Sequence, residues 1–261
     1  MKNKVLKNIV ICIISAIVYF IAAYPLRDIF AVFTVTDVRP GAVVNPFLSI
    51  CFGPAASIGC MISNCFADYL SGYPTKVLYQ GLIPQFLYGY IPYLMWKKFT
   101  KGDEHSHRLD NTKKILQFTL ISLVYGIISG ICVGYIVQSN FGANFLNTLI
   151  FVFLNNFDMT MILGCPLMIA SNIIISAHRN NKIRSLSLNE IIILFTNVVE
   201  LVGMIIIGFA VYKTNANVDS SVYNVWNTIY TYSTLYINIM MVASFILMLI
   251  IERRGFDNEI R

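Results

Sequence analysis

Charged residues are scarce in this chain. Only 12% of its 261 residues are Asp, Glu, Lys or Arg, whereas 57% are hydrophobic. A soluble domain carries about 25% charged residues, because its surface faces water. The composition therefore excludes a soluble enzyme and a nucleic-acid-binding domain. It predicts an all-α polytopic membrane helix bundle in the cell membrane, with helices of about 20 residues crossing the bilayer.

Histidine and cysteine are not arranged as in metal centres or catalytic sites. The three histidines lie outside the apolar stretches, and the six cysteines lie inside them without a closely spaced pair. We therefore expect no metal site, no cofactor and no disulfide framework. His-Glu-x-x-His, Gly-x-Ser-x-Gly and the phosphate-binding Gly-x4-Gly-Lys motif are absent, which favours a protein that is not an enzyme. An intramembrane transferase that uses Asp68 and Asp158 is the enzymatic alternative.

What the chain has instead is a series of long uncharged windows. They mark where it lies in lipid, because Lys or Asp at the bilayer centre costs roughly 2.5–3.5 kcal/mol. The first window lacks a small-x-small cleavage site and predicts a retained span rather than a signal peptide. Residues 143–156 are short and interrupted by Asn, so they predict a half-buried or re-entrant helix. We expect crossings near residues 6–24, 41–53, 54–70, 78–96, 115–137, 159–176, 189–212 and 228–251.

The crossings predict three parts: a six-helix core over residues 1–177, a basic loop over 178–188, and an additional helix pair with a tail over 189–261. Lys and Arg, which give the chain its net charge of +6, concentrate in residues 97–114, in the 178–188 loop and near both ends. By the positive-inside rule these loops and both termini face the cytoplasm. Residues 213–227, with one Lys and one Asp, face outside.

Polar groups at membrane depth are the best indicators of function in such a chain. The densest cluster follows the first span, where three prolines break regular helix and free backbone carbonyls. Small residues recur at every fourth position over Gly59, Ser63 and Ala67, which predicts one closely packed helix face. The candidate substrate residues of this cluster are Asp37, Arg39, Asn45, Asn64 and Asp68.

Structural interpretations of the same residues stay open. Asp37 and Arg39 are either anchors at the outer water boundary or ligands of an anionic or hydrogen-bonding substrate group. Asp68, expected near the outer end of its span, is either a helix-stabilising carboxylate or a ligand, and a salt link from Asp68 to Arg39 is a third alternative.

A second cluster comprises Asn155, Asn156 and Asp158, followed by Gly164 and Pro166. Its spacing faintly repeats that of the first cluster, and a pair of interrupted apolar segments can mark the binding site of a transporter. The cluster predicts further substrate residues, and the alternative is a plain turn between two apolar helices.

Asn197 and Glu200 lie three residues apart in the middle of a later span. A carboxylate at this depth is rare unless it is paired, protonated or beside water. Proton coupling is one use for it. We favour the other, structural hydrogen bonding to a neighbouring helix.

Aromatic residues interleave with amides and prolines in the fourth expected span. Tyrosines that share a stretch with Gln80 and Gln85 would suit a flat heterocyclic ligand. These are Tyr73, Tyr79, Tyr88, Tyr90 and Tyr93.

Several short motifs follow one another in the first part of the chain: Asp37-Val38-Arg39-Pro40, Phe52-Gly53-Pro54-Ala55-Ala56, Gly59, Asn64 and Ala67-Asp68. Together they resemble the substrate-binding S component of energy-coupling factor (ECF) transporters. The later stretch Leu163-Gly164-Cys165-Pro166-Leu167, after Asn155-Asn156, is similar to a later helix of that group.

The resemblance implies a six-helix protein that captures a vitamin-like micronutrient from outside. Transport would then require a membrane coupling subunit and two ATPase subunits, which fits the missing phosphate-binding motif. In this group the first helix often carries Ala-x3-Ala for docking on the coupling subunit. Here the helix has the looser set Ser15, Ala16, Ala22 and Ala23.

Two other functions remain as alternatives to an S component. One is a stand-alone permease in which Glu200 or Asp68 carries the coupling proton. The other is a membrane sensor or structural module that binds a ligand without transporting it. In each case the partners are a small molecule and the lipid bilayer, and not a nucleic acid.

Overall fold

The structure, a computed structural model, describes residues 2–25, 41–101, 108–180 and 185–215, together with six single positions between 239 and 250. The candidate substrate residues Asp37 and Arg39 lie outside the described residues. The same is true of most of the expected last crossing, residues 228–251.

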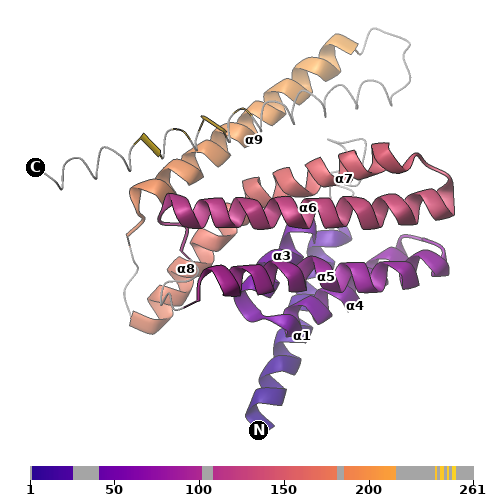
Figure 1. The fold of residues 1–261 in the computed structure, drawn as a ribbon, viewed down its shortest axis with the longest axis horizontal. Coiled ribbons are helices and arrows are strands. Elements are labelled where there is room, and N and C mark those ends of the chain that lie inside the picture. The colour runs from indigo at the N-terminus through magenta and orange to yellow at the C-terminus, as the bar shows by residue number, and fades with distance from the viewer. Residues whose placement is uncertain are drawn as a thin grey trace, which may run out of the picture. The chain divides into compact units, whose positions relative to one another are not determined.

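Every regular element in the described ranges is helical, which confirms the predicted all-α membrane helix bundle. Three stretches are long and apolar enough to cross a membrane: Asn3–Ala23, Thr112–Phe141 and Phe145–Ile174. The helices shown in Figure 1 are α1 (Lys2–Ala23), α3 (Gly41–Phe52), α4 (Pro54–Leu70), α5 (Thr75–Phe99), α6 (Thr112–Phe141), α7 (Phe145–Met159), the π-helical η1 (Thr160–Gly164), α8 (Cys165–Asn180) and α9 (Leu188–Asn215).

The chain divides into two compact units. The first contains α1, α3, α4, α5, α7 and the greater part of α6, and the second contains the beginning of α6, most of η1, α8 and α9. In the first unit α1 packs against α4, α4 against α5, and α3 against α1, α4, α5 and α7. In the second unit α8 packs against α9.

A tight turn joins α3 to α4, as the sequence predicts. Gly53 has φ of 84°, a conformation that side-chain-bearing residues rarely adopt, and Pro54 begins α4, where its missing N–H costs no helical hydrogen bond. The turn places two short helices, of 12 and 17 residues, side by side against α5.

The predicted small-residue face of α4 packs against α1. A Cβ atom at Gly59 would overlap the carbonyl of Cys12 and would lie 3.1 Å from the backbone nitrogen of Ala16. On the same face of α4, Ser63 and Ala67 are buried. Close backbone approach of this kind is how membrane helices gain contact without a hydrophobic driving force.

A second glycine face, which the sequence analysis missed, joins α6 to α7. A Cβ at Gly126 or Gly130 would lie 3.0 and 2.7 Å from the backbone oxygens of Phe153 and Leu149. Gly134 faces the backbone oxygen of Phe145 in the same way, at 3.2 Å. The glycines recur at every fourth residue of α6, and their partners recur at every fourth residue of α7, so the two helices run antiparallel and side by side (Figure 1).

The expected separation of a half-buried or re-entrant helix over residues 143–156 from a crossing over residues 159–176 is wrong. Asn144 caps α7 by accepting a hydrogen bond from the backbone N–H of Asn147, and the helical run then continues without a break through η1 into α8. The alternative of a turn at Asn155 and Asn156 is wrong for the same reason, because both residues lie inside α7.

The α6–α7 contact can be tested by adding one methyl group. Gly130→Ala should destabilise the protein by about 1–3 kcal/mol, because a Cβ has no room beside the backbone of Leu149. Gly81→Ala is the matched control, since a Cβ there meets nothing within 4 Å. Thermal unfolding in detergent should show a lower Tm for the Gly130 variant alone. Equal Tm values for the two variants would contradict this packing.

Candidate functional site

A chain of buried polar groups crosses from α5 to α3 and α4 in the first unit. The Nδ2 atom of Asn45 donates to the carbonyl of Gln85 at 2.6 Å, and its Oδ1 accepts from the Ser49 hydroxyl at 3.2 Å. The hydroxyl of Ser57 donates to that of Ser49 at 2.8 Å. Asn45, Ser49 and Ser57 are almost completely buried. Asn45 therefore links α3 directly to α5, and Ser49, which donates to Asn45 within α3, accepts the hydrogen bond that links α3 to α4.

Gly89 of α5 lies against this chain. A Cβ at Gly89 would overlap Asn45 Oδ1 and Ser49 Oγ and would lie 2.7 Å from Ser57 Oγ. The three helices can share these hydrogen bonds because the backbone of α5 carries no side chain here. The sequence analysis missed Ser49 and Ser57, although Asn45 and Ser49 are spaced four residues apart on an apolar helix.

Pro46 lies inside α3 and has no N–H to donate to the carbonyl of Ala42, four residues earlier. The hydroxyl of Tyr125, on α6, donates to this carbonyl at 2.7 Å. The ring of Tyr125 packs edge-on against that of Tyr88 on α5, with centroids 5.8 Å apart. Two buried aromatic rings thus lie beside the first turn of α3, directly after the segment that carries Asp37 and Arg39.

The tyrosines of α5 do not form a single pocket. Tyr88 is buried, whereas Tyr79 is 70% exposed, and Tyr90 stacks on Phe86. Gln80 accepts a hydrogen bond from Asn140 of α6 at 2.6 Å. Of the expected aromatic group, Tyr88 is therefore the member that lies inside the bundle.

Asn64 and Asp68 lie together on α4 as the sequence predicts. The Nδ2 atom of Asn64 donates to Asp68 Oδ2 at 2.7 Å, and its Oδ1 accepts from the hydroxyl of Tyr19 on α1 at 2.8 Å. Tyr19 is buried, and the two α4 side chains are half-buried. A hydroxyl, an amide and a carboxylate thus form a line across the α1–α4 contact.

The second polar cluster lies near the end of α7. Asn156 Nδ2 donates to the hydroxyl of Ser129 on α6 at 2.7 Å, which in turn donates to the carbonyl of Gly126 at 2.9 Å. Asp158 is buried. Asn155 is 7% exposed, and its Oδ1 has no hydrogen-bond partner in the described part of the chain. Asn156 is thus hydrogen-bonded to α6, whereas the buried acceptor oxygen of Asn155 has no donor among the described residues.

In the second unit, Asn197 hydrogen-bonds to another helical segment, whereas the structural interpretation of the Glu200 carboxylate stays a prediction. Its Nδ2 donates to the carbonyl of Ile162 at 2.8 Å and lies 3.4 Å from that of Met161. Glu200 is 1% exposed, and its Oε2 has no partner among the described residues.

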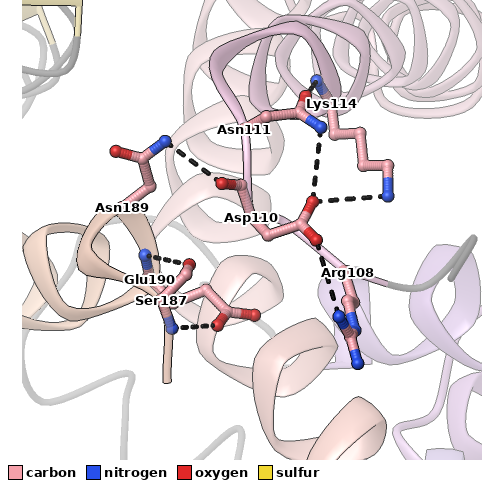
Figure 2. A network of polar contacts seen from close by, with 7 residues as sticks. All are labelled: Arg108, Asp110, Asn111, Lys114, Ser187, Asn189 and Glu190. Carbon is pink, nitrogen blue, oxygen red and sulfur yellow. Dashed lines mark hydrogen bonds and ion pairs between the residues drawn. The ribbon is translucent and has the colours of Figure 1, made fainter. Parts of the chain in front are cut away.

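A polar network at the beginning of α9 was not predicted (Figure 2). Asp110 forms ion pairs with Lys114 and Arg108 at 3.3 and 3.9 Å, and Asn189 donates to the Asp110 carbonyl at 3.2 Å. Figure 2 also shows Ser187 and Glu190 capping each other's backbone N–H groups at 3.3 and 2.9 Å. The signal in the sequence was the Ser-x-x-Glu spacing of a capping box.

Apolar helices of membrane-spanning length around buried amides and carboxyls define a membrane protein with a polar interior, the class to which carriers of small molecules belong. The model of the QueT transporter family matches residues 8–173, more than half of the chain. The chain therefore belongs to the QueT transporter family, a family of ECF S components, as the motif resemblance predicted. No curated protein and no solved structure matches the chain.

A single substitution, Tyr125→Phe, removes the hydroxyl that replaces the missing N–H donor of Pro46. Tyr125→Phe should destabilise the protein by about 1–3 kcal/mol, because the buried carbonyl of Ala42 then loses its donor. Tyr79→Phe, an exposed position on α5, should change stability by less than about 0.5 kcal/mol. Chemical unfolding in detergent measures both. An unchanged midpoint for Tyr125→Phe would refute the proline compensation.

Proposed function

We propose that this chain captures a queuosine precursor for an ECF-type importer. The observation that carries the proposal is the match of residues 8–173 to a family of S components, whose substrate is a queuosine precursor. Such a precursor is a flat, purine-like heterocycle that presents N–H donors and ring faces. Binding and alternating exposure are the whole mechanism, with no covalent step and no cofactor.

The buried acceptor of Asn155 supports a ligand at the end of α7. A polar atom without a partner inside a membrane protein is costly, and an N–H donor of a bound heterocycle would satisfy it. Helix α7 packs against α3, whose first turn lies beside the rings of Tyr88 and Tyr125. Amides with aromatic faces are the usual lining for a flat polar ligand.

The remaining candidate residues take different roles in this proposal. Asp37 and Arg39 precede α3 and bind polar groups at the edge of the ligand. Asn64 and Asp68 offer an amide and a carboxylate, and Asn45 holds α3 in place through the Gln85 carbonyl. In α7, Asn156 and Asp158 stand beside Asn155 in sequence and complete the polar side of the site.

Transport requires a membrane coupling subunit and two ATPase subunits, with both termini of this chain in the cytoplasm. The small residues Ser15, Ala22 and Ala23 of α1 are buried within the chain. The exposed face of α1 carries large aliphatic side chains instead, and we place the contact with the coupling subunit there. This face comprises Ile9, Val10, Ile13, Ile14, Ile17, Val18 and Ile21.

One observation favours a second function, proton-coupled uptake by this chain alone. Glu200 is a buried carboxyl group in an apolar helix, and its Oε2 has no partner within the described ranges. Such groups often carry protons in transporters.

Uptake assays separate the two functions. We expect mass spectrometry of the purified chain to detect a bound queuosine precursor, and uptake to require co-expressed coupling and ATPase subunits. Uptake by the chain alone that a protonophore abolishes would favour the permease. Tight binding without uptake in the presence of those subunits would favour a sensor.

Asn155 and Asn147 provide a matched pair on the same helix. Asn155→Ala should weaken binding of a queuosine precursor by about tenfold or more, because one buried hydrogen bond is lost. Asn147 is exposed, and Asn147→Ala should leave the affinity unchanged. Isothermal titration calorimetry in detergent measures both. Equal affinities for the two variants would show that Asn155 does not bind the ligand.

A further inference from the structure

Pro166 creates a shortage of donors at the junction of η1 and α8. It has no N–H, so it donates neither to the carbonyl of Ile162, four residues earlier, nor to that of Met161, five residues earlier. These are the two carbonyls that Asn197 reaches from α9, at 2.8 and 3.4 Å. A side-chain amide from another helix thus stands in for the missing backbone donor.

Asn197, the residue that supplies this donor, lies outside the part of the chain that matches the family. The QueT transporter model ends at residue 173, whereas α9 begins at Leu188. Asn197 is itself buried, and Ile162 is completely buried. The matched part of the chain therefore depends on the additional helix to satisfy its own backbone.

We propose that Asn197 is a positioning residue for substrate binding, which acts by stabilising the π-helical segment Thr160–Gly164. This inference rests on the proposed function. The segment continues directly from the stretch of α7 that carries Asn155, Asn156 and Asp158, and the hydroxyl of Thr160 donates to the carbonyl of Asn156 at 2.6 Å.

Helix geometry gives the reason that the segment matters. A π-turn contains one residue more than an α-turn, and each α-helical residue turns the helix by about 100°. Loss of the π-turn would change the backbone hydrogen bonding directly after the last turn of α7. That turn carries Asn155 with its free acceptor, and the hydroxyl of Thr160 bonds to the carbonyl of Asn156 there.

The anchoring of α9 at its beginning is separate from this contact. Asn189 donates to the carbonyl of Asp110, and the Ser187–Glu190 capping box closes the first turn (Figure 2). One residue before Asn197, Thr196 donates its hydroxyl to the carbonyl of Ile192 in its own helix. Thr196→Val is therefore a matched control that removes a buried polar group of α9 whose hydrogen bond stays within α9.

The test uses Asn197→Leu, which keeps the size of the side chain and removes the donor. We expect the dissociation constant of a queuosine precursor to rise by about tenfold or more. Amide hydrogen exchange over residues 158–168 should become faster. Thr196→Val should leave both properties as in the unchanged chain. Unchanged binding in Asn197→Leu, or an equal loss in Thr196→Val, would overturn the positioning role.

A second substitution tests the cause. Pro166→Ala restores an N–H at the position where Asn197 compensates, so it should slow the exchange of Asn197→Leu back toward the original rate. If Asn197→Leu does not fold alone, recovery of folded protein in the double variant supports the inference, and failure of the double variant overturns it. Failure of the unchanged chain to bind the precursor would overturn the proposed function, and with it the positioning role.

Discussion

A backbone carbonyl inside a membrane helix bundle has no water as a hydrogen-bond donor. A proline within a helix leaves such a carbonyl without its usual backbone donor. For Pro46 and Pro166 the donors come from other helices. Tyr125 serves the carbonyl opposite Pro46, and Asn197 serves the two carbonyls that Pro166 cannot reach. Each contact fixes the register of a helix pair, α3 with α6 and η1 with α9.

Close approach of the helix backbones makes such hydrogen bonds between helices geometrically possible. Gly59, Gly89 and Gly130 each occupy a place where a Cβ would meet backbone or polar atoms of another helix. Short polar side chains such as Ser49 and Ser129 can then span the contact with hydrogen bonds of 2.8 and 2.7 Å. The glycines thus let the helices approach closely, and the small polar residues form hydrogen bonds between them. Together they hold the helices in register with few charged groups.

Much of the fold could be predicted from the sequence, because charge-free windows and the Gly53–Pro54 turn depend on local chemistry. The family could also be predicted, since its motifs are contiguous. Which side chains pair could not be predicted, because partners such as Ser129 for Asn156 are 27 residues apart and come together only through packing. For the same reason the expected break near Asn155 and Asn156 was wrong, since both residues lie inside α7 and Asn156 bonds to Ser129 of α6. The substrate-binding roles of all the candidate residues, Asp37 and Arg39 among them, remain predictions.

The pairing of Pro166 with Asn197 has a consequence for comparisons within the family. Pro166 belongs to the stretch that resembles a later helix of S components, whereas Asn197 lies beyond the matched residues 8–173. A relative that keeps this proline but has no helix like α9 would have to supply the donor for the corresponding carbonyl from one of its core helices.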